Sequence, residues 1–172
     1  HLQVDARSLS GTQQQPPNEE LLFQTFQEQA RLLASAGAQG SVLETFTDLH
    51  ETLLAVLAAK TTELPVIASV VFDSGGGRHR MASGHAPADA AKTLTNAGAD
   101  IIGANCGLGI EWSLPICKRL HASTKLPIWM KPNAGVPTLA GNRVIYPTSP
   151  RNFAMYAQVL SNLGADFIGV CC

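Results

Sequence analysis

The chain has 172 residues, 45% of them hydrophobic, and a net charge of −1 from 12 Lys and Arg against 13 Asp and Glu residues, which is enough apolar sequence for the core of one ordinary domain. No cluster of basic residues indicates a nucleic-acid partner, and no apolar run approaches the roughly 18 residues that a membrane-spanning helix needs. The first 20 residues are polar and carry no secretory signal, and because the chain opens on His1 with no core element before the first helix, we expect an N-terminal portion to be missing.

Helices and short apolar strands are predicted to alternate along the chain. Asn18, Asp48 and Ser149 are typical helix N-caps, and Gly37 marks the end of the first helix. The predicted helices cover residues 19–36, 49–60, 87–96 and 113–122, the last with Pro115 in its first turn, and a segment that begins at Pro150. The predicted strands cover residues 41–44, 65–72, 100–104, 127–130 and 165–170. Loops are expected at the Gly-rich residues 74–79 and at residues 133–147.

The order of these elements predicts an α/β fold. The apolar runs are nearly continuous, as in strands that are buried on both faces, and the intervening helices imply parallel connections. Asn96-Ala-Gly-Ala-Asp-Ile-Ile-Gly103 closely resembles Asn162-Leu-Gly-Ala-Asp-Phe-Ile-Gly169, and residues 35–43 are a looser copy. Repeated helix–Gly–strand units favour a (β/α)8 TIM barrel over a doubly wound sheet. Because about five βα units are present, we expect residues 1–172 to form one incomplete barrel domain that lacks its N-terminal strands and final C-terminal helix.

Polar and thiol side chains follow the predicted strands. In TIM barrels the catalytic groups lie at the carboxyl ends of the strands, so these residues are the candidates for a functional site. They are Glu44 with Thr45, Asp73, Asn105 with Cys106, Lys131 with Asn133, and Cys171 with Cys172.

Three of the four cysteines, Cys106, Cys171 and Cys172, are in this set, and cysteine thiolates are preferred ligands of Zn²⁺. Cys171 and Cys172 are adjacent, so both can reach one ion only where the strand ends and the backbone turns. Buried apolar thiols and a vicinal disulfide are the alternatives. Cys117 lies in the middle of a predicted helix and is assigned to the core. A chain of this size does not need disulfides, so we expect reduced thiols and a cytoplasmic protein.

Other residues have both a chemical and a structural interpretation. Residues 75–80 could bind phosphate through glycine N–H groups, although a surface loop is favoured because no helix follows directly. His79 and His85 are interpreted as solvated loop residues rather than metal ligands. Lys131 could form a Schiff base at a strand end or position the loop that follows it. Glu44 could serve the site or simply flank a helix.

Four motifs near the strand ends occur together in one known family. They are Leu43-Glu-Thr-Phe-Thr-Asp-Leu-His-Glu51, Gly103-Ala-Asn-Cys106, Lys131-Pro-Asn-Ala-Gly-Val-Pro137 and Gly169-Val-Cys-Cys172. In this order and spacing they resemble the homocysteine S-methyltransferase family, which includes betaine- and S-methylmethionine-dependent enzymes and the homocysteine domain of cobalamin-dependent methionine synthase. The resemblance runs from about Asn18 to Cys172, with Val170 at a position where the family usually has glycine.

The resemblance implies a zinc-dependent barrel that transfers a methyl group to the thiol of homocysteine and so forms methionine. Cys106, Cys171 and Cys172 match the three zinc ligands of the family, and Glu44 matches an acidic residue that binds the amino group of homocysteine. Asn105 is a second candidate for the substrate site. A bound Zn²⁺ would stabilise a substrate thiolate at its open fourth position. The implied partners are homocysteine, a methyl donor, and a cobalamin- or folate-binding domain or subunit; methylcobalamin, betaine and S-methylmethionine are all candidate donors.

Two other functions remain open from the sequence. The chain could be a non-catalytic barrel remnant whose cysteines are merely buried, or a different TIM-barrel enzyme that uses zinc for hydrolysis. Zinc content would separate the first alternative from an enzyme, and methyl transfer to homocysteine would exclude the second.

Overall fold

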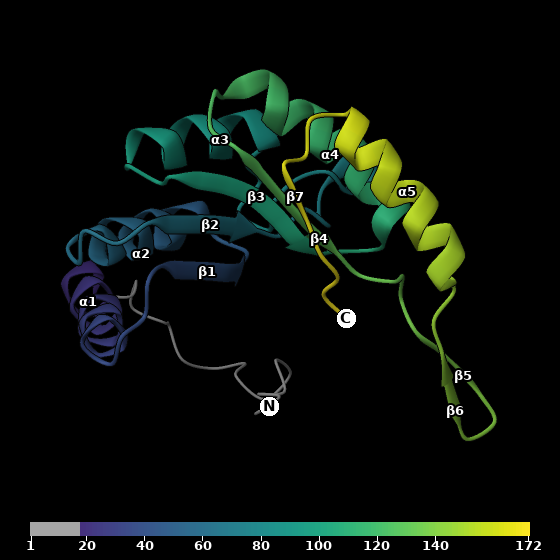
Figure 1. The fold of residues 1–172 in the computed structure, drawn as a ribbon, viewed down its shortest axis with the longest axis horizontal. Helices are drawn as coiled ribbons and strands as arrows, with labels where there is room; N and C mark the ends of the chain where they lie inside the picture. Colours follow the sequence, from purple (N-terminus) through teal and green to yellow (C-terminus); the bar gives the residue numbers. More distant parts are fainter. Residues whose placement is uncertain (1–17) are drawn as a thin grey trace, which may run out of the picture.

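Five parallel strands form the main sheet in the computed structural model, which describes residues 18–172 (Figure 1). Their order across the sheet is β1 (Ser41–Phe46), β2 (Val66–Val70), β3 (Ile101–Cys106), β4 (Ile128–Pro132) and β7 (Phe167–Ile168). This sheet keeps the order of the chain, as a barrel does, whereas a doubly wound sheet reverses its order part-way. The predicted α/β fold with parallel βα units is therefore confirmed. The expectations for the polar N-terminal segment lie outside the described residues.

Helices connect the strands and pack on the sheet (Figure 1). They are α1 (Glu19–Ser35), α2 (Leu49–Lys60), α3 (Pro87–Asn96), α4 (Ile110–Ser123), α5 (Pro150–Asn162) and the short 3₁₀ helix η1 (Gly76–Arg78). The three predicted N-caps are present, because the side chains of Asn18, Asp48 and Ser149 each accept a backbone N–H group of the first turn. Within residues 18–172, no helix combines the length and the hydropathy needed to span a bilayer.

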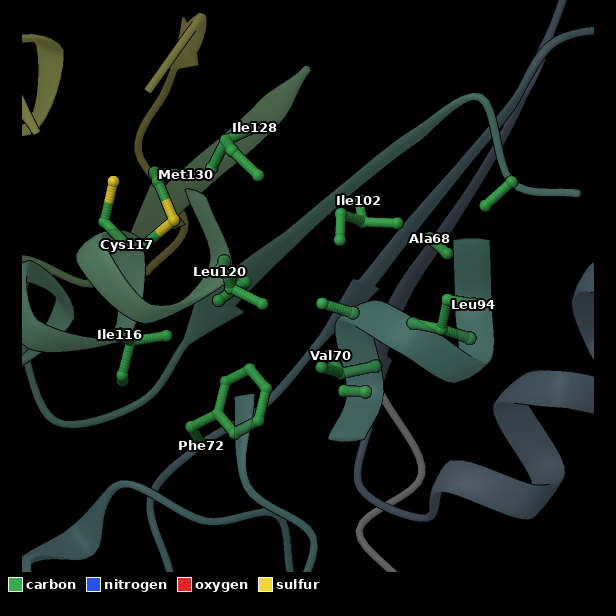
Figure 2. Packing of buried hydrophobic residues seen from close by; sticks show 14 of the residues in the cluster. Ala68, Val70, Phe72, Leu94, Ile102, Ile116, Cys117, Leu120, Ile128 and Met130 are labelled. Atoms are coloured by element: carbon green, nitrogen blue, oxygen red, sulfur yellow. The ribbon is translucent and has the colours of Figure 1, made fainter. Parts of the chain in front are cut away.

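The hydrophobic core lies between the sheet and its helices (Figure 2). The sheet contributes two rows of in-register side chains, Ala68, Ile102 and Ile128 in one row and Val70, Ala104 and Met130 in the next. The helices contribute Val56, Leu94, Ile116, Leu120 and Leu160 among others. Cys117 of α4 is fully buried in this cluster, which confirms its assignment to the core. Because side chains alternate along a strand, the intervening residues face the other side of the sheet.

The sequence repeat fixes the beginning of two strands. Gly98 and Gly164 follow α3 and α5 with φ angles of 92° and 99°, a region that favours glycine. Two residues later, the carboxylates of Asp100 and Asp166 each accept the N–H group of the first residue of the preceding strand in the sheet, β2 and β4 respectively, at 2.8 Å. Each repeat therefore ends a helix and sets the register of two neighbouring strands, and the register determines which residues emerge at their carboxyl ends.

The start of α4 differs from the prediction. The helix begins at Ile110, so Pro115 lies in its second turn and not in its first. Gly109, with a φ of 148°, allows the sharp turn that starts the helix early. The hydroxyl group of Ser113 donates to the carbonyl oxygen of Ile110 at 2.6 Å, within the first turn.

The strands also differ from the prediction in several places. The segment predicted as a plain loop contains an antiparallel hairpin of β5 (Thr138–Ala140) and β6 (Arg143–Ile145). Strand β1 continues to Phe46, because pairing with β2 resumes after an irregularity at Glu44 and Thr45. Strand β7 is shorter than predicted, although the N–H groups of Gly169 and Cys171 still donate to carbonyl groups of β4.

Gly103 lets β3 and β4 approach closely just before the strand ends. A Cβ atom at this position would overlap the carbonyl group of Trp129 on β4, and a backbone group cannot rotate away as a side chain can. We expect Gly103→Ala to lower the free energy of unfolding by about 1–3 kcal/mol, the cost of an overpacked site, as measured by urea denaturation. Gly76→Ala is the control, because its Cβ atom meets open space. Equal losses in the two variants would contradict this account of Gly103.

Candidate metal centre

Strand β4 lies between the two segments that carry the candidate ligands. Cys106, at the end of β3, is in register with Pro132 of β4. On the other side of β4, the N–H group of Cys171 donates to the carbonyl oxygen of Pro132 at 3.0 Å. The two cysteines therefore flank the same residue at the carboxyl edge of the sheet, and Cys172 follows directly.

The three thiols converge above this edge. The sulfur of Cys171 lies 3.7 Å from that of Cys106 and 4.0 Å from that of Cys172, and all three sulfur atoms lie within 4.8 Å of one another. In a tetrahedral zinc site with Zn–S bonds of about 2.3 Å, two sulfur ligands are about 3.8 Å apart. Cys106 has a φ of 62°, an uncommon conformation for a side chain other than glycine, which turns it at the strand end. The donor set and its spacing therefore fit one tetrahedral ion.

The burial and bonding of the cysteines distinguish a metal site from its two alternatives, a cluster of buried apolar thiols and a vicinal disulfide. Cys106 and Cys171 are half-buried, Cys172 is exposed, and none of the four cysteines forms a disulfide, so neither the vicinal disulfide nor a fully buried apolar cluster is present. Burial raises the pKa of the Cys106 thiol to about 11, and the hydrogen bond and charge of Cys171 act in the same direction. Three thiolates this close repel one another, and a divalent cation would offset that repulsion.

Asn133 holds both cysteine segments together, a role that the sequence did not reveal. Its side-chain oxygen accepts the N–H group of Cys172 at 2.9 Å, and its side-chain nitrogen donates to the carbonyl oxygen of Gly107 at 2.8 Å. Its own N–H group donates to the carbonyl oxygen of Cys106 at 3.3 Å. The motif that begins at Lys131 contained this residue, but the groups that it reaches depend on the register of three strands.

Asn105 lies directly beneath the thiols and is 3% exposed. Its side-chain oxygen accepts the N–H group of Thr45 at 3.0 Å and the hydroxyl group of Ser69 at 2.8 Å. Its side-chain nitrogen donates to the hydroxyl oxygen of Thr45 at 2.7 Å and lies 3.9 Å from the sulfur of Cys171. These bonds fix the amide and also hold Thr45 at a φ of 69°, within the irregularity of β1.

Glu44 and Lys131 form an ion pair on the same edge of the sheet. Nζ of Lys131 donates to Oε1 of Glu44 at 2.7 Å, and the side chains are 26% and 30% exposed. The hydrogen bond to Glu44 raises the pKa of Lys131, and the charges of Glu44, Cys171 and Cys106 contribute in the same direction. A raised pKa disfavours the Schiff-base interpretation of Lys131, because that reaction needs the neutral amine.

The remaining candidates do not join the thiol cluster. Among the described residues, the three cysteines form the one group of possible metal ligands, so neither His79 nor His85 is part of it. The carboxylate of Asp73 accepts the hydroxyl group of its neighbour Ser74. The ring of His79 lies 6.2 Å from that of Trp112. Within residues 18–172, neither contact gives evidence of a second metal site.

The match to a protein family covers nearly the whole chain. The family model described as homocysteine S-methyltransferase matches residues 4–172. The chain belongs to the homocysteine S-methyltransferase family. Among curated relatives of this family member, methionine synthase of Mycobacterium tuberculosis (strain ATCC 25618 / H37Rv) is 28% identical over an alignment of 154 positions, which covers 86% of this chain and 13% of the relative. Betaine–homocysteine S-methyltransferase 1 of Bos taurus is 26% identical over an alignment of 190 positions, which covers 98% of this chain and 46% of the relative. The chain thus spans less than half the length of these relatives.

Solved structures show the same fold for this homocysteine S-methyltransferase family member. The apo form of the homocysteine methyltransferase MmuM from Escherichia coli gives a TM-score of 0.72 at 20% identity and covers 94% of this chain and 55% of that one. The metallated form gives a TM-score of 0.66 at 23% identity and covers 87% of this chain and 47% of that one. At these identities the likeness concerns the fold, and it agrees with the βα arrangement of a TIM-barrel-like enzyme.

If the three cysteines hold a zinc ion, we expect Asn133→Ala to weaken its binding roughly 10- to 100-fold, the usual effect of removing a residue that orients a metal ligand. The variant frees the N–H group of Cys172 and the loop at Gly107, so two ligands lose their fixed positions. Competition with a chromophoric chelator measures the affinity. Asn96→Ala, at the exposed end of α3, is the matched control. An unchanged affinity in Asn133→Ala would show that the cysteines hold their geometry without it.

Proposed function

We propose that this chain is part of an enzyme that transfers a methyl group to the sulfur of homocysteine in a zinc-dependent reaction and so forms methionine. The observation that carries the proposal is the convergence of Cys106, Cys171 and Cys172 at the carboxyl edge of a parallel sheet. Membership of the homocysteine S-methyltransferase family supports homocysteine as the thiol substrate. A site with three protein ligands leaves the fourth position of a tetrahedral ion for the substrate, as in other catalytic zinc sites.

The protein groups are proposed to bind and orient. A zinc ion held by the three cysteines would lower the pKa of the substrate thiol, so that the substrate is present as the more nucleophilic thiolate at neutral pH. Asn133 fixes the backbone of Cys172, and Asn105 directs an N–H group toward the sulfur of Cys171. These contacts would hold the sulfur atoms in one arrangement, so that the substrate sulfur faces the donor's methyl group in a single orientation.

Glu44 is proposed to bind the amino group of homocysteine, since its partly exposed carboxylate lies at the same edge of the sheet as the thiols. Asn105 was the other substrate-binding candidate from the sequence. Its two acceptor and two donor positions all face groups of the protein itself. We therefore propose that Asn105 orients Cys171 and Thr45, and that the substrate contact is made by Glu44.

The rest of the barrel and the source of the methyl group are proposed from the similarity to known proteins. Because the chain covers 55% of the MmuM structure, we propose that it forms part of a TIM barrel whose other strands are supplied elsewhere in the protein. The similarity to methionine synthase supports a cobalamin- or folate-binding domain or subunit as the source of the methyl group, and the similarity to the betaine enzyme supports a free donor. Four unpaired cysteines favour a reducing, cytoplasmic environment.

The test of this function uses the full-length protein. We expect one zinc ion per chain by elemental analysis, and transfer of a labelled methyl group to homocysteine from methylcobalamin, betaine or S-methylmethionine. Cys106→Ser, Cys171→Ser and Cys172→Ser should each lower both the affinity for zinc and the rate of transfer by more than about 100-fold, because removing a ligand exceeds the effect of removing its supporting residue.

Cys117→Ala is the matched control, because this cysteine is buried in the core and lies outside the cluster. It should keep its zinc and its activity. A protein that contains no zinc, or that contains zinc but transfers no methyl group from any of the three donors, would refute the proposed function.

A further inference from the structure

The ion pair of Glu44 and Lys131 has unused hydrogen-bonding capacity. An ammonium group has three donors and a carboxylate has two acceptor oxygens. Within residues 18–172, the bond between Nζ and Oε1 is the one hydrogen bond that either charged group makes. Both side chains are partly exposed, at 26% and 30%. Two N–H groups of Lys131 and Oε2 of Glu44 therefore remain available to a ligand, and the ion pair does not have to break when that ligand binds.

The pair also lies beside the thiol cluster. Lys131 is in register with Asn105, whose neighbour Cys106 carries one of the three thiols. The hydrogen bond to Glu44 raises the pKa of Lys131, and the charges of Cys171 and Cys106 add to this effect, so the ammonium group stays protonated beside the thiols. A ligand whose sulfur occupies the open position of that centre would have its other end near the two opposite charges.

We propose that Lys131 binds the α-carboxylate group of the thiol substrate, so that Glu44 and Lys131 together form a receptor for the zwitterionic end of an amino acid. This inference rests on the proposed function, because it takes the substrate to be homocysteine. An α-amino acid carries its ammonium and carboxylate groups on one carbon atom, so its receptor needs two opposite charges side by side. The ion pair supplies that arrangement with Glu44 for the ammonium group and Lys131 for the carboxylate group.

This arrangement also gives selectivity. A thiol without a carboxylate group leaves the free N–H donors of Lys131 without a charged partner. A thiol without an ammonium group leaves Oε2 of Glu44 without a charged partner. Sites built to pair with a polar group reject ligands that lack it, because the protein group is then left desolvated and unpaired. Lys131 is thus a specificity-determining residue for amino-acid thiols over simple thiols.

Binding of three thiols to the zinc-loaded, full-length protein tests this role. They are homocysteine, 3-mercaptopropylamine, which lacks the carboxylate group, and 4-mercaptobutanoate, which lacks the ammonium group. In Lys131→Met we expect the dissociation constants of homocysteine and 4-mercaptobutanoate to rise roughly 10- to 100-fold, as for a lost charged hydrogen bond. The constant for 3-mercaptopropylamine should stay the same or fall, since Glu44 no longer has a competing partner. Lys131→Arg should keep most of the affinity for homocysteine.

The control is Lys60→Met, which removes a comparable ion pair between Lys60 and Asp100 at 2.9 Å. Asp100 directly precedes β3, so this ion pair lies at the opposite end of the sheet from the thiols. It should leave all three constants unchanged. Equal weakening of all three thiols in Lys131→Met would show a structural role and overturn the proposal, as would no weakening of homocysteine. If the unaltered protein binds both zinc and homocysteine, either result refutes only the role of Lys131. If the unaltered protein fails to bind zinc or fails to bind homocysteine, the proposed function fails as well.

Discussion

The pairing of β4 with a neighbour on each side is the constraint on which the site depends. Cys106 and Cys171 flank Pro132, and their thiols meet although the two residues are 65 positions apart in the chain. Small errors in register would direct a side chain to the other face of the sheet. The aspartates of the two repeats act against such slippage, because each fixes the first residue of the neighbouring strand. The convergence of the three thiols is thus prepared at the opposite end of the same strands.

Electrostatic balance is the second requirement at the carboxyl edge of the sheet, where the three thiols lie. Three thiolates and Glu44 would place four negative charges near one another, and burial raises the pKa of the Cys106 thiol to about 11 without a compensating cation. Lys131 provides one positive charge, and a divalent metal ion would provide two more. Asn105 and Asn133 add oriented N–H groups without adding charge. Asn105 and Asn133 therefore join the cysteine segments by hydrogen bonds, whereas Glu44 and Lys131 act on the thiols through their charges.

Local signals predicted most of the fold. The N-caps at Asn18, Asp48 and Ser149 and the alternation of helices with apolar strands depend on neighbouring residues, so they can be read from the sequence. The strand-end rule of parallel sheets also placed Cys106 near Cys171 and Cys172. The contacts of Asn133 and the ion pair of Glu44 with Lys131 join segments far apart in the chain, and their geometry depends on strand register. The hairpin of β5 and β6 was missed because its strands are short and every residue in them is exposed, so no buried face marks them in the sequence.

The hairpin of β5 and β6 can change in sequence and length without a change in the positions of the cysteines. It follows β4 and projects from the body of the domain (Figure 1). Its base is fixed, because the N–H group of Ala134 donates to the carbonyl oxygen of Cys172 and the N–H group of Thr148 donates to that of Ala134. Sequence between these two points can lengthen, shorten or diverge without moving the cysteines. A change of sequence in this loop would therefore alter the shape and charge of the rim beside the thiols and leave the buried framework beneath it in place.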